Sequence, residues 1–393
     1  MKRKILRIGR ILPLVLISFL VSCSDDDWEP LNEIVEEEPE DPDPEEPTEY
    51  DWAETAQLMQ EDTYTAYLGT NGVFKEKPGN DRFHYWWNAH VLDVLVDGYL
   101  RSDNDAYVSQ MNALVEGIRT HNGDTYQNVF VDDMQWLGIS SLRAYEATGD
   151  ERFKEVADFL WEEVKKAWTD EFGGGLLWKM DEPHGKNACS NGPGAILAMR
   201  MYETDQNEED LEWAQDIYAW EKETLVDPTN GLVWDNIALV DGEPVINKDW
   251  IFTYNVGTYL GAALELYEAT GEDVYLQDAI RSAKSSMTSS QLLEGDILKS
   301  EGQGDGGLFK GILIRYLTNL TLESDLDQET RSQITEFIEL NATTLVEEGM
   351  QSSPKLVGPL WSEVPSEPTD LSTQLSGLML IEAAALLDEE GAL

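Results

Sequence analysis

The feature that most constrains the fold is a phrase that recurs along the chain. It reads LRAYEATGD at Leu142–Asp150, MRMYETD at Met199–Asp205 and LELYEATGE at Leu264–Glu272. Each copy joins the end of an apolar helix to a tight turn and the acidic start of another helix. Gly149 and Gly271 suit the left-handed residue that closes a helix. The spacing of the copies is typical of a repeated helical hairpin, so we expect an all-α domain.

Between these turns the hydrophobic pattern predicts helices of two kinds. One kind is amphipathic and charged, as expected of outer helices, at residues 51–68, 104–120, 151–168, 208–225, 273–290 and 325–348. The other kind is apolar or small almost all round, as expected of buried helices, at residues 84–100, 132–147, 188–203, 251–269, 306–319 and 371–387. Six outer and six inner helices predict an (α/α)6 barrel of six helical hairpins, with an open α-solenoid as the alternative. No alternating run with hairpin turns predicts a competing strand.

The connections between the helices differ in length. Inner helices lead to outer ones through the short YEATGD-type turns, whereas outer helices lead to inner ones through six long loops, at 69–83, 121–131, 169–187, 226–250, 291–305 and 349–370. All the long loops must therefore open on one rim, together with the N-termini of the inner helices. Long loops on a rigid scaffold commonly carry function, so we expect the functional site on this rim.

The first 49 residues have the composition of an export signal followed by a tether. Basic residues precede the apolar run 11–21, which is too short to span a bilayer and predicts a signal peptide over residues 1–22. Leu20-Val21-Ser22-Cys23 resembles a bacterial lipobox, so Cys23 is the expected lipidation site; an incidental cysteine after an ordinary signal peptide is the alternative. Residues 23–49 are rich in Glu and Pro and predict a disordered tether before a folded domain over residues 50–393. The acidic residues after Cys23 resemble a surface-export signal and favour a surface-exposed outer-membrane lipoprotein over a periplasm-facing one.

The net charge of −50 narrows the class of ligand. A chain this acidic argues against nucleic acid and against anionic polysaccharide, so a neutral ligand is expected. The only internal cysteine, Cys189, is expected to be a small buried side chain rather than part of a disulfide framework. The four histidines lack metal-ligand spacing, and we expect no metal and no cofactor. We further expect a monomer that contacts the membrane only through the lipid on Cys23.

Two neighbouring carboxylates stand at the start of the second inner helix, in VFVDDMQW at 129–136. Asp132 and Asp133 could simply stabilise the helix N-terminus, where aspartate is favoured. Alternatively, two carboxylates that share a partly dry cleft repel each other, and the pKa of one rises. That arrangement supplies an ionised nucleophile and a protonated acid, the pair that a retaining glycosidase needs.

Several segments, in the same order, resemble glycoside hydrolase family 76, the endo-α-1,6-mannanases. The resemblance includes the aspartate pair, the TYNQG-like segment 252–258, the FKGI-containing segment 306–312, and the stretches 85–89 and 187–193. It implies a retaining, endo-acting α-1,6-mannanase that works outside the cell on neutral α-mannan, without a cofactor. By position, Asp132 would be the nucleophile and Asp133 the general acid/base. The chain departs from the family pattern at Val256, where a glutamine is usual, and at Leu137, where an aromatic is common.

Other residues on the same rim are candidates for contact with sugar. The aromatic and polar side chains we select are those of Trp136, Trp178, Asn187, Tyr254, Asn255 and Asp305. Lys310 is expected to reach an acidic partner such as Asp305 or Asp133. Two other functions stay open: a surface glycan-binding lipoprotein that has the barrel but no turnover, and another (α/α)6 glycosidase or a lyase.

Overall fold

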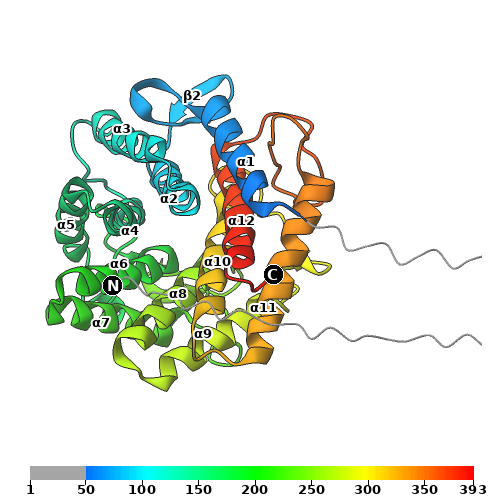
Figure 1. Ribbon diagram of the computed structural model, residues 1–393. Coiled ribbons are helices and arrows are strands. Elements are labelled where there is room, and N and C mark those ends of the chain that lie inside the picture. Colours follow the sequence, from blue (N-terminus) through cyan, green and yellow to red (C-terminus); the bar gives the residue numbers. More distant parts are fainter. Residues whose placement is uncertain (1–49) are drawn as a thin grey trace, which may run out of the picture. The chain divides into compact units, whose positions relative to one another are not determined.

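Long helices alternate along the chain between an outer and an inner position (Figure 1). In the computed structural model, which describes residues 50–393, the outer helices are α1 (Trp52–Tyr67), α3 (Asp105–His121), α5 (Glu151–Lys165), α7 (Glu208–Leu225), α9 (Asp273–Ser286) and α11 (Gln328–Thr344). The inner helices are α2 (Tyr85–Ser102), α4 (Val131–Thr148), α6 (Ala188–Asp205), α8 (Thr253–Thr270), α10 (Gly306–Leu322) and α12 (Leu371–Glu389). The predicted signal peptide, Cys23 and the tether lie outside the described residues.

The inner helices form a closed ring. Each packs on the next in chain order from α2 to α12, and α12 also packs on α2 and α1. The all-α (α/α)6 barrel of six helical hairpins is thereby confirmed, and the open solenoid is excluded. Within residues 50–393, no helix combines the length and the apolarity that crossing a membrane requires.

The turns that close the inner helices follow the repeated phrase. Gly149 ends α4 with a φ of 69° and Gly271 ends α8 with a φ of 68°, both in the left-handed region, as predicted. Asp103 and Gln206 take the same conformation at the ends of α2 and α6. A left-handed residue lets the chain reverse within one turn, so each hairpin can pack tightly.

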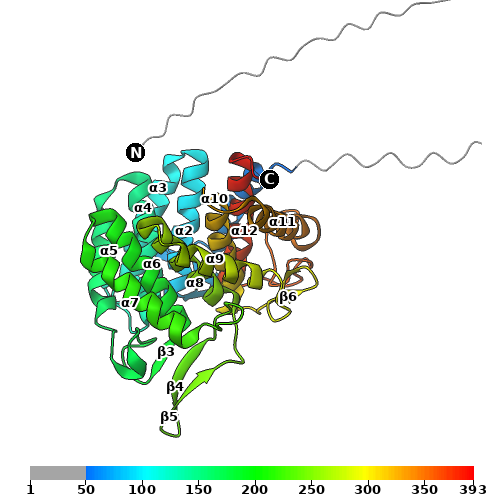
Figure 2. The same ribbon diagram turned by 90° about the horizontal axis from the view of Figure 1, so that it is seen from below.

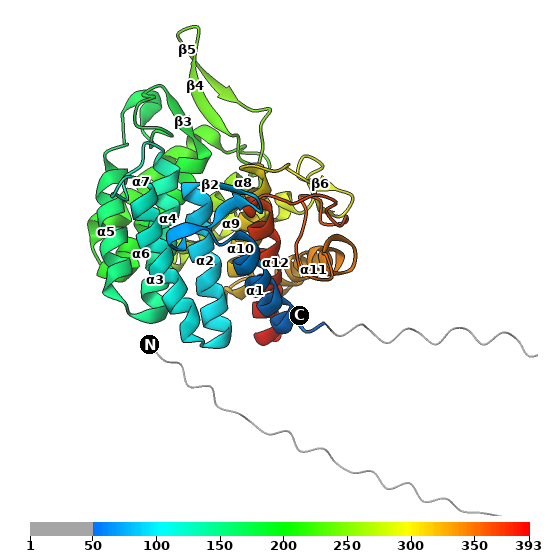
Figure 3. The same cartoon turned by 90° about the horizontal axis from the view of Figure 1, so that it is seen from above.

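The long loops contain short strands, which the sequence analysis did not predict. β1 (Lys75–Lys77) pairs with β2 (Asn80–Phe83), and β6 (Leu293–Glu294) pairs with β7 (Ile297–Leu298), all antiparallel. The largest sheet has the order β3 (Gly185–Asn187), β4 (Asn236–Val240), β5 (Glu243–Asn247) and stands out from the rim of helices (Figures 2 and 3). The signal for this hairpin was Asp241-Gly242, whose φ angles of 54° and 87° form the turn that two-residue hairpins favour.

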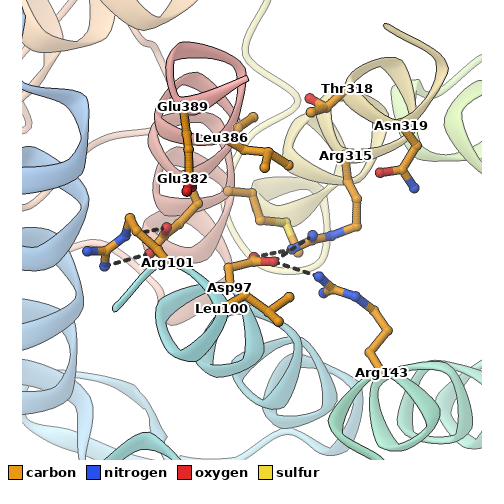
Figure 4. A pocket seen from close by; sticks show the side chains of 12 residues that line it. Asp97, Leu100, Arg101, Arg143, Arg315, Thr318, Asn319, Glu382, Leu386 and Glu389 are labelled. Carbon is orange, nitrogen blue, oxygen red and sulfur yellow. Dashed lines mark hydrogen bonds and ion pairs between the residues drawn. The ribbon is translucent and has the colours of Figure 1, made fainter. Parts of the chain in front are cut away.

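The barrel interior is more charged than the apolar pattern of the inner helices predicted. Toward the C-terminal ends of these helices, Asp97 of α2 pairs with Arg143 of α4 at 2.7 Å and with Arg315 of α10 at 2.6 Å (Figure 4). Arg101 pairs in the same region with Glu382 at 2.9 Å. These side chains line a small hollow of about 130 Å³, in which every arginine already has a carboxylate partner. The hollow therefore has the character of a structural ion-pair network.

Candidate active site

A cleft of about 720 Å³ opens at the opposite end of the barrel, where the inner helices begin. Its lining comes from the first turns of these helices, from the 169–187 loop and from the sheet: Trp86, Asp132, Trp136, Trp178, Asp181, Glu182, Pro183, His184, Gly185, Asn187, Cys189, Asp235, Asn236, Ala238, Trp250, Phe252, Tyr254, Asp305 and Phe309. The site thus lies on the rim that the loop lengths predicted.

The two neighbouring aspartates occupy the first turn of α4 but differ in exposure. Asp132 is half-buried and lines the cleft, whereas Asp133 is buried, with 9% exposure, and lies behind it. Oδ2 of Asp133 accepts a hydrogen bond from Nδ2 of Asn128 at 2.9 Å. The N-cap of α4 is Phe130, and no side chain caps the helix there. Neither aspartate therefore occupies the N-cap position of α4.

The surroundings of the pair give the two carboxyl groups different pKa values. Burial raises the pKa of Asp132 to about 7, although the Cys189 thiol and the backbone N–H groups of Asp132 and Asp133 stabilise its charge. Burial, followed by the charges of Asp132 and Asp305, raises the pKa of Asp133 well above its ordinary value. At neutral pH Asp133 therefore keeps its proton, while Asp132 ionises more readily. From the sequence we expected repulsion within the pair to raise one pKa; in the structure both are raised, and burial is the first cause for each.

Asp305 is the third carboxylate near the pair. Its Oδ1 accepts hydrogen bonds from Nε1 of Trp86 at 2.9 Å and from Nε1 of Trp87 at 3.0 Å. Its side chain makes no capping bond to α10 and instead lines the cleft. Asp305 is thus held by two indoles of α2 beside the catalytic candidates.

Aromatic rings make up much of the rest of the lining. Tyr254 stacks on Phe309 with ring centroids 3.8 Å apart and planes 10° from parallel. Trp136 is 3% exposed at the cleft, and its ring lies 4.6 Å from the buried His90. Apolar ring faces beside carboxylates suit a sugar, because a pyranose presents C–H groups on its faces and hydroxyls on its edges.

The 169–187 loop forms part of the cleft and is held from below by Lys186. This buried side chain donates hydrogen bonds to the carbonyls of Thr169 and Glu171, each at 2.7 Å, and to that of Gly174. Trp178 packs on Phe130 at 5.3 Å. The loop therefore presents Asp181, Glu182 and His184 to the cleft from a fixed backbone.

The predicted sugar contacts separate into two groups. Trp136, Trp178, Asn187, Tyr254 and Asp305 line the cleft. Asn255 does not; it is fully buried and donates from Nδ2 to Oδ1 of Asp235 at 3.2 Å. The prediction of direct contact was wrong for Asn255, because each helical residue turns about 100° from its neighbour and only Tyr254 faces the cleft.

One further expectation needs correction. Lys310 donates to the carbonyl of Pro359 at 2.8 Å and lies 3.9 Å from the centre of the Trp361 ring, not against Asp305 or Asp133. Cys189 is buried as predicted, but it also lines the cleft beside Asp132. Val256 and Leu137, where the chain departs from the family pattern, are both fully buried and outside the cleft lining.

Several cleft residues were missed in the sequence analysis. Three of them, Trp86, Phe252 and Phe309, lie in or next to the first turns of inner helices. The predicted starts of these helices could therefore have identified them. Asp235 and Trp250 flank the β4–β5 hairpin, whose placement the sequence did not reveal. Within residues 50–393, no group of three or more His, Cys, Asp or Glu side chains is arranged to hold a metal ion.

The helical hairpins close into a ring with an aromatic cleft, which one carboxyl group of the aspartate pair lines while the other lies buried next to it. This fold and site define a glycoside hydrolase of the (α/α)6 class. More narrowly, the chain belongs to glycosyl hydrolase family 76, which it matches over residues 51–393. It is thus a glycoside hydrolase by both fold and family.

Solved structures superpose closely on the chain. An α-1,6-mannanase from a Salegentibacter species is 58% identical, with a TM-score of 0.85 over 86% of this chain and 100% of that one. A protein from Listeria innocua is 35% identical, with a TM-score of 0.80 over 86% and 98% of the two chains.

A curated relative, a mannan endo-1,6-alpha-mannosidase of Saccharomyces cerevisiae, is 25% identical over 72% of this chain and 66% of its own length. The chain thus spans about two thirds or less of the length of the first curated relatives that it matches.

Proposed function

We propose that this protein is a retaining, endo-acting α-1,6-mannanase that hydrolyses the backbone of neutral α-mannan outside the cell. One observation supports this most directly. A variant of the Salegentibacter mannanase with two consecutive aspartates replaced is inactive and binds α-1,6-mannotriose. Between residues 50 and 393 this chain has one pair of consecutive aspartates, Asp132-Asp133.

The proposed first step forms a covalent glycosyl-enzyme. The ionised carboxylate of Asp132 attacks the anomeric carbon, and the bond to the departing oxygen breaks as Asp133 gives that oxygen its proton. The raised pKa of Asp133 suits this role, because a general acid must hold its proton at the working pH. The hydrogen-bond donors around Asp132 favour the ionised form that attacks.

The second step releases the sugar and restores both groups. Asp133, now ionised, takes a proton from a water molecule, whose oxygen attacks the anomeric carbon and displaces Asp132. Two displacements on the same carbon retain its configuration. The reaction consumes one water and needs no cofactor.

The proposed setting follows from the N-terminal sequence. A lipid on Cys23 and the acidic tether after it support an outer-membrane lipoprotein whose monomeric domain faces the outside of the cell, where mannan chains occur. Comparing proteinase digestion of whole and broken cells tests this location. A protein cut only in broken cells would favour the periplasm-facing alternative.

A binding protein without turnover is the less supported candidate. The absence of the family's usual glutamine at position 256 would favour it mildly, but Val256 is fully buried and does not line the cleft. Both carboxyl groups of the pair are present, with pKa values raised in the order that catalysis needs.

The decisive experiment separates the roles of the two aspartates. Digestion of linear α-1,6-mannan should release α-configured oligosaccharides, and both Asp132→Ala and Asp133→Ala should lose nearly all of this activity. With an aryl α-mannoside and azide, Asp133→Ala should form the α-mannosyl azide and Asp132→Ala the β-azide. If the wild-type protein binds mannan but releases no product, the binding-protein hypothesis replaces this one.

A further inference from the structure

We propose that Trp250 forms an outer mannosyl subsite, where a sugar unit remote from the scissile bond stacks on its indole ring. This inference rests on the proposed function and adds to it the part of the cleft that senses chain length. Trp250 lines the cleft and is 57% exposed. Among residues 50–393 it is the only exposed tryptophan, whereas every other one is buried or half-buried.

The backbone that carries Trp250 is fixed. Its carbonyl accepts a hydrogen bond from the backbone N–H of Asp235 at 3.0 Å, at the base of the β4–β5 hairpin. Beside it, Nζ of Lys248 lies 3.9 Å from the centre of the Trp234 ring. An aromatic side chain on a backbone fixed in this way loses little conformational entropy when a ligand covers it.

A series of rings connects Trp250 with the catalytic centre. The centroid of Trp250 lies 6.2 Å from that of Phe252, which lies 5.4 Å from that of Phe309. Phe309 lies 6.4 Å from Trp86, whose indole binds Asp305. All four rings line the cleft, so an oligosaccharide can follow apolar faces from the exposed edge to the carboxylates.

The charge of the cleft restricts the ligand to a neutral glycan. Asp132, Asp235 and Asp305 line it, and no lysine or arginine is among its lining residues within the part of the chain that the structure describes. A phosphorylated or uronic-acid-bearing chain would meet carboxyl groups there and no lysine or arginine to pair with its charge. The indole face and the acidic lining together fit an uncharged hexose oligosaccharide.

Because Phe252 and Phe309 lie between Trp250 and Asp305, the indole can contact only a unit some distance from the bond that breaks. Loss of the ring should therefore weaken binding of long substrates more than that of short ones. One lost stacking contact corresponds to about a tenfold fall in affinity.

The test compares Trp250→Ala, Trp250→Phe and Val240→Ala on a length series of linear α-1,6-mannooligosaccharides and on the polymer. Val240 is 53% exposed on the β4–β5 hairpin, which precedes Trp250, and does not line the cleft, so it is a matched control. For Trp250→Ala the ratio of kcat/KM on the polymer to that on the shortest cleaved oligosaccharide should fall by about tenfold. Trp250→Phe should keep most of the wild-type ratio, and Val240→Ala should leave the ratio unchanged.

Calorimetry provides a readout that does not depend on turnover. In a background of Asp132→Asn and Asp133→Asn, adding Trp250→Ala should weaken binding of the longest oligosaccharide and affect mannotriose less. An unchanged length dependence in both measurements would overturn the inference while leaving the mannanase assignment intact. Failure of the wild-type protein to cleave any α-1,6-mannan would instead refute the proposed function.

Discussion

The indole nitrogen of Trp86 lies 2.9 Å from Oδ1 of Asp305, so the first turn of α2 holds a carboxylate at the start of α10. Trp87 donates to the same oxygen. This places a third negative charge beside the aspartate pair, where it raises the pKa of both Asp132 and Asp133. Asp305 therefore influences the pH dependence of the site as well as its shape.

Replacing Asp305 with asparagine should shift the acid limb of the pH profile of kcat/KM to lower pH. The substitution removes one of the charges that raise the pKa of Asp132, so the nucleophile ionises earlier. Asp181→Asn is the control, because Asp181 lines the cleft but does not raise the pKa of the aspartate pair. The acid limb of the pH profile of this variant should match that of the wild-type protein. An unmoved limb in Asp305→Asn would contradict this account.

The wild-type protein should show a bell-shaped pH dependence of kcat/KM. Activity should rise by about tenfold per pH unit below a midpoint near 7, because Asp132 must lose its proton before it can attack. It should fall again at higher pH, as Asp133 loses the proton that it must donate. Initial rates across a buffer series check both limbs, and a flat profile through neutrality would argue against these roles.

Replacing Asp132 with asparagine should stabilise the fold while abolishing activity. The pKa of Asp132 is about 7 in the folded protein, against an ordinary 3.8, so the folded state retains a proton that the unfolded state loses in this window. The stability of the wild-type protein therefore falls as pH rises from 3.8 to about 7, whereas the asparagine variant lacks this loss. At neutral pH this linkage gives a gain on the order of 4 kcal/mol. Thermal unfolding of both proteins at pH 4 and pH 7 measures this gain. An equal difference in stability between the two proteins at both pH values would count against the prediction.

Breaking the buried ion pair of Arg200 and Glu265 should destabilise the barrel. Their side chains pair at 2.8 Å between α6 and α8, each about 10% exposed. Arg200→Leu leaves the carboxylate buried without its partner and should cost about 3–5 kcal/mol, less at acidic pH, where Glu265 can protonate. The double variant with Glu265→Leu should recover most of the loss. Urea unfolding of the single and double variants measures these losses of stability. If the two side chains do not interact, the loss in the double variant will equal the sum of the losses in the two single variants.

Much of the fold was predictable because its determinants are local. The apolar periodicity of each helix and the left-handed turns at Gly149 and Gly271 act within a few residues, so the sequence alone predicted twelve helices and their order. The position of Asp132 and Asp133 at the mouth of an inner helix followed from the same pattern. Only the short strands escaped it, since runs of two to five residues carry little periodic signal.

The composition of the cleft was decided by the tertiary structure. Trp86 and Asp305 are 219 positions apart in the chain, and no local pattern indicates that they meet. The same holds for Trp250, which lines the cleft from the segment that follows the β4–β5 hairpin. It also holds for Asn255, which a single helical step turns away from the cleft. The sequence determined where each helix begins and ends, because hydrogen bonds and side-chain burial along a helix depend on near neighbours. Only closure of the ring decided which distant side chains line one acidic cleft, and thereby raised the pKa values of Asp132 and Asp133.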